Sequence, residues 1–329
     1  MVSVGVLGAS GYSGGELLRL LDGHPEFEVG QVWANASAGQ PLGSLHPHLA
    51  TLAGLQVERF EAADVDVDFV FMALPHGQSA QYAQELAVPV VDLGADFRLH
   101  DEAKWQQYYG GTFAGTWTYG LPEIPGQREE IAESTNVANP GCYATAIALA
   151  THPLMGLIAA QDIVVVAASG TSGAGRSPSV GLLATEVTSG MRPYKVGGVH
   201  QHTPEIEQTL GSEARISFTP LLAPMARGII ATVSAPYTGG DVAAALHGAY
   251  GQEPFVRLLP EGLWPATQMT LGSNSAALQW AVDEHAGRVV VCCAIDNLGK
   301  GAAGQAIQNA NLMLGFDETS GLPVNGVAP

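Results

Sequence analysis

The residue in this sequence best placed for nucleophilic chemistry is Cys142. It follows the turn-forming letters NPG and precedes an apolar stretch, residues 143–154, whose composition predicts a helix. Because a helix N-terminus lowers the pKa of a thiol, we expect Cys142 to react as a thiolate. The other two cysteines, Cys292 and Cys293, lie in the apolar strand segment VVVCCAI and are expected to be inert filler.

A thiolate that attacks a carbonyl group needs an acid–base partner. The segment VHQHTPEIEQTL supplies His200, His202 and Glu205 just ahead of a predicted helix. In an extended segment the two histidines point the same way, and only one of them is needed for catalysis. This cluster is the best candidate among the ten histidines of the chain.

The few basic residues are also informative, because the chain has 13 of them against 31 acidic residues and a net charge of −18. Such a charge argues against nucleic acid or an anionic membrane as a partner. Six cations lie in Gly- or Pro-punctuated loops or at strand ends, where they could hold an anionic substrate. They are Arg98, Arg176, Arg192, Lys195, Arg227 and Lys300.

A glycine-rich turn, GASGYSG from Gly8 to Gly14, joins the first predicted strand to a helix. Glycines at this spacing allow a tight turn and bring a pyrophosphate close to backbone N–H groups at a helix N-terminus. The turn therefore predicts a dinucleotide site.

The end of the second predicted strand, VWANASAG, indicates which dinucleotide binds. NAD sites usually carry a carboxylate here for the ribose 2′-hydroxyl, but this segment has no Asp or Glu. That favours NADP, with Ser37 and backbone amides near the 2′-phosphate, although no arginine lies nearby.

The elements that must position these residues fall into two parts. Over the first ~140 residues apolar strands alternate with helices, which predicts a doubly wound parallel sheet of the Rossmann type. From about residue 160 the strands are longer and richer in β-branched residues, which predicts an α+β domain with a mixed or antiparallel sheet. The helical segment after Asn297 is expected to return to the first domain. We therefore expect a dinucleotide-binding domain of residues 1–141 and 297–329, and a catalytic and oligomerisation domain of residues 142–296.

Composition narrows the setting of the protein. A chain of 329 residues with 47% hydrophobic and 13% charged residues is typical of a well-buried globular enzyme. Three cysteines cannot form a disulfide framework, which favours a reducing, cytoplasmic location. We expect no secretory signal, no membrane span and no metal site.

Nine segments, taken together and in order, closely resemble the N-acetyl-γ-glutamyl-phosphate reductases, which belong to the wider aspartate-semialdehyde dehydrogenase-like family. They are GASGYSGGEL, ALPHGQS, VDLGADFRL, YGLPEI, NPGCYAT, SGTSGAGR, HQHTPEI, PMARGI and DNLGKGAAGQAIQNANLM. The resemblance runs from residue 4 to the tail. It implies NADPH-dependent reduction of an acyl phosphate to an aldehyde, in arginine biosynthesis, by a homodimer or homotetramer.

The resemblance also implies roles for individual residues. Cys142 would expel phosphate and form a thioester, with His200 preferred over His202 as the acid–base group and Glu205 orienting it. The substrate's carboxylate or phosphate would contact Arg98, Arg176 and Lys195. The cofactor would be held by Gly8, Ser10, Gly11, Tyr12, Ser13 and Gly14 at the pyrophosphate, by Leu74, Pro75 and His76 at the adenosine and ribose, and by Asn297 and Lys300 at the nicotinamide.

Two alternatives stay open. The acyl phosphate could be a different one, aminoadipyl phosphate of a lysine route or aspartyl phosphate. The chain could also be a sensor that binds NADP without turnover, although a sensor would need neither the cysteine at a helix start nor the histidine pair.

Overall fold

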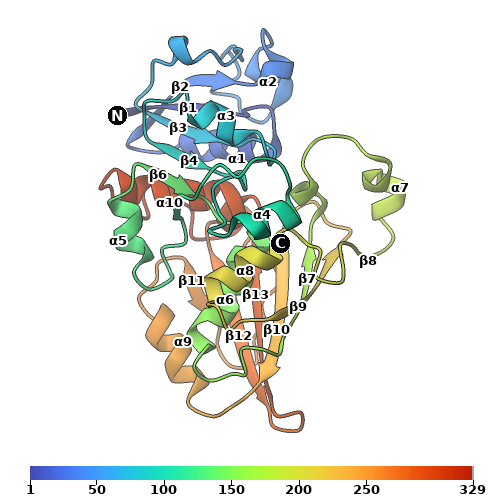
Figure 1. Ribbon diagram of the computed structural model, residues 1–329. Coiled ribbons are helices and arrows are strands. Elements are labelled where there is room, and N and C mark those ends of the chain that lie inside the picture. The colour runs from blue at the N-terminus through green and yellow to red at the C-terminus, as the bar shows by residue number, and fades with distance from the viewer. Residues whose placement is uncertain (328–329) are drawn as a thin grey trace. The chain divides into compact units, whose positions relative to one another are not determined.

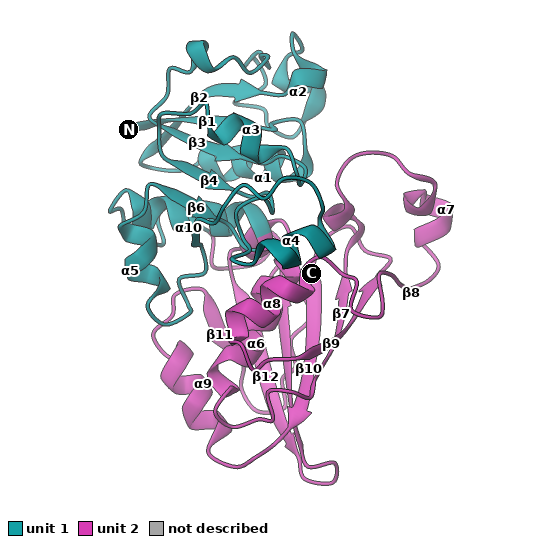
Figure 2. Ribbon diagram, in the orientation of Figure 1, with its two compact units in different colours: residues 1–140, 302–322 teal, residues 141–301, 323–329 magenta. Residues whose placement is uncertain are grey.

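The computed structural model describes residues 1–327, and by their contacts these residues divide into two compact units (Figure 2). Unit 1 comprises residues 1–140 and 302–322. Unit 2 comprises residues 141–301 and the described part of the tail from residue 323. Within residues 1–327, none of the helices is both long and apolar enough to cross a membrane.

Unit 1 is built on a six-stranded sheet with the strand order β2-β1-β3-β4-β6-β5, in which every neighbouring pair is parallel (Figure 1). Its strands are β1 (Val2–Leu7), β2 (Phe27–Trp33), β3 (Phe69–Met72), β4 (Val90–Asp92), β5 (Thr118–Tyr119) and β6 (Asn136–Ala138). Its helices are α1 (Tyr12–Leu21), α2 (Leu42–Leu45), α3 (Ser79–Ala83), α4 (Glu102–Tyr108), α5 (Gln127–Ala132) and α10 (Gly304–Met313), with short 3₁₀ turns η1 (Asn35–Ser37) and η2 (Ala62–Asp64).

The central strands β1 and β3 of unit 1 are mostly apolar because a parallel sheet covered on both faces has no polar side. All four residues of β3 are buried, as are the last four of β1. The C-terminal helix α10 lies in this unit and buries amide side chains as well as apolar ones. One of them, Asn309, donates to the carbonyl oxygen of Gly120 at 2.9 Å and to Asn139 Oδ1 at 3.1 Å. These bonds satisfy the buried amide and tie α10 to the loops beside the sheet.

Unit 2 is built on a seven-stranded mixed sheet with the order β11-β12-β13-β10-β7-β9-β8. The pairs β7–β9 and β11–β12 are parallel and the other pairs are antiparallel. Its strands are β7 (Ile163–Ser169), β8 (Arg192–Pro193), β9 (Ile216–Leu222), β10 (Ile229–Pro236), β11 (Val256–Leu258), β12 (Ala276–Asp283) and β13 (Arg288–Ile295).

The helices of unit 2 are α6 (Cys142–Thr151), α7 (Ala184–Val187), α8 (Thr203–Leu210) and α9 (Val242–Tyr250). Short turns of 3₁₀ helix are η3 (His152–Leu154), η4 (Thr171–Ala174), η5 (Val180–Leu182) and η6 (Thr267–Met269). A π-helical turn, η7 (Gly299–Ala303), links the end of this unit to α10.

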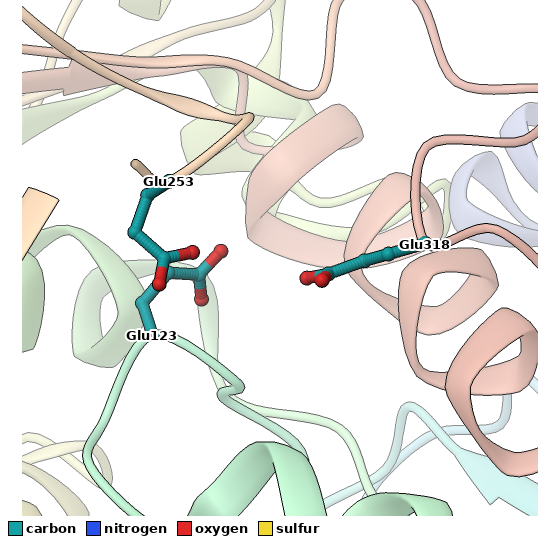
Figure 3. A group of neighbouring side chains, drawn as sticks. All are labelled: Glu123, Glu253 and Glu318. Atoms are coloured by element: carbon teal, nitrogen blue, oxygen red, sulfur yellow. The ribbon is translucent and has the colours of Figure 1, made fainter. Parts of the chain in front are cut away.

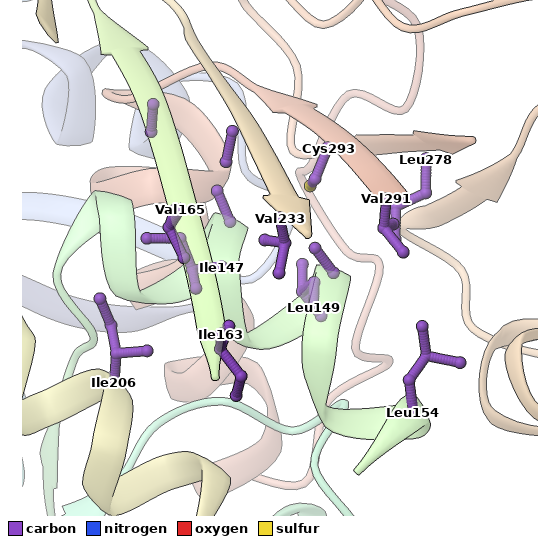
Figure 4. Packing of buried hydrophobic residues seen from close by; sticks show 14 of the residues in the cluster. Ile147, Leu149, Leu154, Ile163, Val165, Ile206, Val233, Leu278, Val291 and Cys293 are labelled. Carbon is purple, nitrogen blue, oxygen red and sulfur yellow. The ribbon is translucent and has the colours of Figure 1, made fainter. Parts of the chain in front are cut away.

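The core of unit 2 forms where α6 packs on β10 and β13 (Figure 4). From Tyr143 to Thr151 every residue of α6 is buried, and a helix that is apolar all round is expected to lie inside a core. Cys293 is fully buried in this cluster, and burial raises the pKa of its thiol. Cys292 points to the other face of the sheet, where it is half-buried beside Thr232.

The predicted fold class is confirmed: a parallel, Rossmann-type sheet is followed by an α+β part with a mixed sheet. The helix predicted after Cys142 is also confirmed. Cys293 packs in the core as a small buried residue, as predicted. The predicted functions of the two domains, cofactor binding on one side and catalysis with oligomer contacts on the other, stay predictions.

Candidate active site

Cys142 is the first residue of α6, and the turn ahead of it is fixed by a buried carboxylate. The N–H group of Gly141 donates to Glu205 Oε1 at 2.7 Å, and Glu205 is fully buried. On another side of Cys142 lies Gly301: a Cβ atom built there would be 2.7 Å from Cys142 Cβ. The thiol therefore lies at a helix N-terminus between two closely fitted backbone segments.

The histidine pair lies beside this turn, just before α8. The ring centroids of His200 and His202 are 5.0 Å apart. The N–H group of His202 donates to His200 Nδ1 at 3.1 Å, so a neutral His200 carries its proton on Nε2. The His202 ring packs on Gly141, where an added Cβ would be 2.5 Å from Nε2 of that ring. The structure thus brings Cys142, His200, His202 and Glu205 together within unit 2.

Two tyrosines line the histidine side of the site. The Tyr194 hydroxyl donates to the Tyr143 hydroxyl at 3.1 Å, and the Tyr143 hydroxyl donates to the carbonyl oxygen of Leu221 at 3.3 Å. Both rings meet His200 edge-on, at 5.7 and 5.4 Å between centroids. Burial raises the pKa of Tyr194 to about 12, and nearby Cys142 raises it as well. These hydroxyls therefore stay neutral, and their hydrogen bonds fix the two tyrosine rings beside His200.

The two residues predicted to reach the nicotinamide, Asn297 and Lys300, follow the end of β13. Both ends of the Asn297 side-chain amide are engaged in unit 2: Oδ1 accepts the Gly228 N–H at 2.7 Å, and Nδ2 donates to Ser172 Oγ at 2.9 Å. Lys300 is fully buried, with Nζ 5.6 Å from the centroid of the Phe255 ring. Their predicted contacts with the cofactor stay predictions.

The three cations predicted to bind the substrate differ in exposure. In unit 1, Arg98 is buried; its Nε donates to the carbonyl oxygen of Asn139 and its Nη2 to that of Leu93, both at 2.7 Å. In unit 2, Arg176 and Lys195 are exposed. Lys195 adopts a φ of 46°, a conformation that residues with a side chain seldom take, and Nζ donates to Gln201. The partial burial of its ammonium group lowers the pKa of Lys195. The predicted contacts of Arg98, Arg176 and Lys195 with the substrate stay predictions.

The glycine-rich turn of unit 1 has the geometry of an anion cradle. Gly8 has a φ of 92°, and a Cβ at Gly14 would be 2.4 Å from the carbonyl oxygen of Gly8. The first bond inside α1 runs from the Gly15 N–H to the carbonyl oxygen of Gly11 at 2.9 Å. The N–H groups of residues 12–14 therefore have no partner within the helix and can face an anion. The N–H of Gly8 is used differently, since it donates to the carbonyl oxygen of Trp33 at 2.8 Å.

The remaining predicted cofactor contacts lie on neighbouring turns of unit 1. Ser37 ends η1, directly after β2, and is half-buried. Leu74, Pro75 and His76 follow β3, with Leu74 half-buried and the other two exposed.

Sequence reasoning missed the residue that holds the turn after β3, Asp96. Its carboxylate accepts the Gly77 N–H at 2.6 Å and the Ala80 N–H at 3.1 Å, and it is buried. Asp96 lies in the quoted segment VDLGADFRL, but a hydrogen bond to a loop 19 residues earlier leaves no local pattern.

A second buried acidic group in unit 1 has a structural explanation. Glu123 and Glu318 bring carboxylate oxygens within 4.8 Å of each other (Figure 3). The Gln308 side-chain amide donates to both, at 3.0 and 2.7 Å, and Arg128 pairs with Glu318 at 3.0 Å. Arg128 compensates the charge of Glu318, and the Gln308 amide hydrogen-bonds to both carboxylates, so these contacts attach α10 to the loops beside it. Figure 3 also draws Glu253 of unit 2, whose N–H donates to the carbonyl oxygen of Tyr250 at 3.1 Å.

Two family models match the chain, one on each part. The model of the semialdehyde dehydrogenase NAD binding domain matches residues 3–134, and that of the semialdehyde dehydrogenase dimerisation domain matches residues 142–297. Among solved structures, aspartate semialdehyde dehydrogenase II from Vibrio cholerae has a TM-score of 0.72 at 16% identity, over 95% of this chain and 98% of that one. The Candida albicans enzyme, solved with NADP, has the same score, identity and coverage. At such low identity these structures show a common fold.

Curated relatives are much more similar in sequence. The N-acetyl-γ-glutamyl-phosphate reductase of Acidothermus cellulolyticus is 60% identical over 99% of both chains. Those of Salinispora tropica and Micrococcus luteus are 58% and 54% identical, over 100% and 99% of this chain and 99% of theirs. With this identity along its whole length, and with both semialdehyde dehydrogenase domains matched, the chain belongs to the N-acetyl-γ-glutamyl-phosphate reductase family of oxidoreductases.

Proposed function

We propose that this protein catalyses the NADPH-dependent reduction of N-acetyl-γ-glutamyl phosphate to N-acetylglutamate 5-semialdehyde, with release of phosphate, in arginine biosynthesis. The observation that carries the proposal is the placement of Cys142 at the first position of α6, with the His202 ring against Gly141. Family membership gives the substrate, and this geometry gives the chemistry.

The first step needs only groups of unit 2. Cys142 Sγ, once deprotonated, attacks the acyl carbon of the substrate, the bond from that carbon to the phosphate oxygen breaks, and inorganic phosphate leaves. A thioester on Cys142 remains. We assign to the N-terminus of α6 the stabilisation of the negative charge that the carbonyl oxygen gains in this step.

The second step reduces the thioester and regenerates the thiol. NADPH, when bound, supplies a hydride to the carbonyl carbon. The resulting thiohemiacetal releases the aldehyde when its C–S bond breaks, and sulfur leaves as the thiolate. A histidine takes the thiol proton in the first step and returns a proton in the second, a contribution of typically ~10²–10⁴-fold.

Between the two histidines, the geometry favours His202 as the acid–base group. His200 Nδ1 accepts the His202 N–H, so protonating His200 on that nitrogen would break this bond. The His202 ring lies against the residue before Cys142. We assign proton transfer to His202. His200 supports the His202 backbone by accepting its N–H, and Glu205 fixes the turn before α6 by accepting the Gly141 N–H.

Unit 1 fits the cofactor. The unpaired N–H groups at the start of α1 suit a pyrophosphate, and a Cβ at Gly11 would meet only the Gly8 carbonyl oxygen, at 3.4 Å, which leaves room on its other side. The turn η1 after β2 carries Asn35 and Ser37 in place of a carboxylate, which favours NADP over NAD. Arg176 and Lys195, both exposed, are the proposed partners of the substrate's carboxylate and phosphate.

We further propose a homo-oligomer, a dimer or a tetramer, that forms through unit 2. Its sheet carries α6 on one face, whereas the other face exposes Val164 and Val166 by 38% and 43%. Apolar side chains in one open sheet face are typical of a subunit contact. All three cysteines are thiols, which agrees with a reducing compartment such as the cytoplasm.

A substrate panel tests the proposed function. Phosphate-dependent reduction of NADP⁺ or NAD⁺ is measured with N-acetylglutamate semialdehyde, aspartate semialdehyde and the one-carbon-longer aminoadipate semialdehyde. We expect the highest kcat/KM with N-acetylglutamate semialdehyde and NADP⁺. Much faster turnover of another semialdehyde would contradict the substrate assignment, and tight NADPH binding without any turnover would support a sensor.

A further inference from the structure

Asp296 directly follows β13, and its buried carboxylate accepts hydrogen bonds from one arginine side chain and three main-chain N–H groups. It is fully buried, and Arg227 binds it through Nε at 3.1 Å and Nη2 at 2.9 Å. The N–H groups of Gly272, Leu298 and Gly299 also donate to it, at 2.6, 2.9 and 3.2 Å. Its charge is therefore compensated by one cation and three backbone dipoles.

These bonds fix the chain that follows β13. The side-chain oxygen Oδ1 accepts the two N–H groups that open the turn, while the main-chain carbonyl of Asp296 accepts the N–H of Gly301 at 2.9 Å. One residue thus holds both ends of the turn 296–301, which leads into η7. A carboxylate at the N-terminus of a helical turn also interacts favourably with its dipole.

The turn ends against the proposed nucleophile. A Cβ atom at Gly301 would be 2.7 Å from Cys142 Cβ and 3.3 Å from Cys142 Cα, so the Gly301 backbone already touches that residue. Only a glycine fits there, and a shift of the turn by a few tenths of an ångström would either press on Cys142 or leave a gap beside it.

We propose that Asp296 is a positioning residue for Cys142: through the turn 296–301 it holds Gly301 against the cysteine and keeps the thiol where it attacks. Arg227 is its charge partner. The proposal rests on the proposed function only in taking Cys142 as the nucleophile. A misplacement of about 1 Å at a reacting atom can cost on the order of 100-fold in rate, which is the scale on which such a support acts.

A purely structural ion pair is the competing explanation. Removing one partner of a buried pair destabilises a protein wherever the pair lies, so a fall in thermal stability would not separate the two explanations. The reactivity of the Cys142 thiol does separate them, since it depends on where the sulfur lies and how the α6 N-terminus faces it.

The test uses the full-length protein with two variants and one matched control. Asp296→Asn keeps the size of the side chain and removes its charge. Gly301→Ala adds a methyl group against Cys142 without touching the carboxylate. Asp162→Asn removes the acidic partner of Arg288, an exposed pair of the same unit at 3.3 Å, and serves as the control.

The primary measurement is the second-order rate of alkylation of Cys142 by iodoacetamide as a function of pH, with the modified cysteine identified by peptide mass spectrometry. The steady-state kcat and KM, the Kd for NADPH and the thermal midpoint complete the set. We expect Asp296→Asn and Gly301→Ala to lower the alkylation rate and kcat by about 10- to 100-fold, with KM and Kd changed by less than about threefold. Asp162→Asn should match the wild type.

The proposal is overturned if Asp296→Asn loses thermal stability yet alkylates at the wild-type rate. Should that variant fail to fold, Gly301→Ala decides, and wild-type alkylation in it overturns the proposal equally. Because alkylation needs no substrate, a wrong substrate assignment would leave this result standing, so the two failures are distinguishable.

Discussion

The turn before α1 and the turn before α6 each place a helix N-terminus at a site of chemistry, but different parts of the molecule hold them. In the first, a Cβ at Gly14 would strike backbone, at 2.4 Å from the carbonyl oxygen of Gly8. In the second, a Cβ at Gly141 would strike a side chain, the His202 ring, at 2.5 Å. Backbone atoms of Gly8 cannot move aside for a side chain at Gly14, whereas the His202 ring can rotate away from a side chain at Gly141.

The partners of the two turns also differ in distance along the chain. The first turn closes on itself, since the Gly11 N–H donates to the carbonyl oxygen of Gly8 at 3.1 Å. The second relies on Glu205, 64 residues further along, for its N–H bond, and on Gly301 for the wall beside Cys142. The cofactor turn is therefore a local structure, and the nucleophile turn is assembled by tertiary packing.

The largest effect should come from Cys142→Ser, which leaves both turns intact and removes only the thiolate. A serine hydroxyl is far less acidic than a thiol, so we expect kcat to fall by at least about a thousand-fold. The Kd for NADPH, measured by fluorescence titration, should stay within about twofold of the wild type. Residual activity near the wild-type level would mean that no thioester forms on this residue.

Gly14→Ala tests the rigidity of the first turn. The new methyl group meets backbone atoms of Gly8 and Ala9, so we expect a loss of about 1–3 kcal/mol in the free energy of unfolding and weaker NADPH binding by roughly tenfold. Chemical denaturation and cofactor titration measure the two effects.

Gly11→Ala is the matched control for that variant. Among residues 1–327, and apart from the chain neighbours of Gly11, the new Cβ would meet the Gly8 carbonyl oxygen at 3.4 Å, an ordinary contact. Gly11→Ala should keep wild-type stability. It should weaken NADPH binding only if the added methyl group contacts the bound pyrophosphate. Equal destabilisation by both substitutions would show that the close approach of the Gly8 backbone to Gly14 is not the reason why Gly14→Ala loses stability.

The same contrast explains what could be predicted from the sequence. The turn before α1 was predictable because its requirements are local: glycine spacing, a preceding apolar strand and a following helix. The start of α6 at Cys142 was predictable for a similar reason, from the letters NPG and the apolar run that follows. The strand patterns likewise predicted both sheets.

The supports of the second turn could not be predicted in this way. The bond from Gly141 to Glu205 and the contact between Gly301 and Cys142 join distant segments, and only the fold brings them together. The hydrogen bonds from Arg98 to the main-chain carbonyl oxygens of Asn139 and Leu93 likewise follow from the fold and not from a local pattern, while its predicted contact with the substrate stays a prediction.

A buried carboxyl group in unit 1, that of Asp92, lies beside the chain segment that leads into the turn before α6. Changes at Asp92 should have the smallest effect of those predicted here, and a specific one, on the dependence of stability on pH. Its main-chain carbonyl accepts the N–H of Asn139 at 2.8 Å, two residues before Gly141. Its Oδ1 accepts from Ser79 Oγ at 2.7 Å and from the Gly94 N–H at 2.9 Å. Burial, the largest cause, raises the pKa of Asp92 to about 7. Asp96 raises it further, and Arg98 opposes the rise.

This raised pKa sets a direction for the dependence of stability on pH. Between about pH 4 and pH 7 the folded protein keeps the Asp92 proton that the unfolded chain has already lost. The contribution of this group to stability is therefore fully present below about pH 4, and it is lost as pH rises toward 7. Asp92→Asn cannot titrate, so its free energy of unfolding should fall less than that of the wild type over this window, by up to about 1.4 kcal/mol per pH unit. Denaturation at several pH values measures the difference, while turnover near neutral pH should change little.

Ser79→Ala should extend the fall in stability to higher pH, whereas Asp92→Asn should reduce it. The Ser79 hydroxyl donates to Asp92 Oδ1 and thereby favours the ionised carboxylate, so its loss should raise the pKa of Asp92 and carry the fall in stability to higher pH. If the wild type, Asp92→Asn and Ser79→Ala all show the same pH dependence, then Asp92 is ionised in the folded protein. In that case the two donors to Oδ1, Ser79 Oγ and the Gly94 N–H, would be enough to hold a charged carboxylate at the buried end of β4.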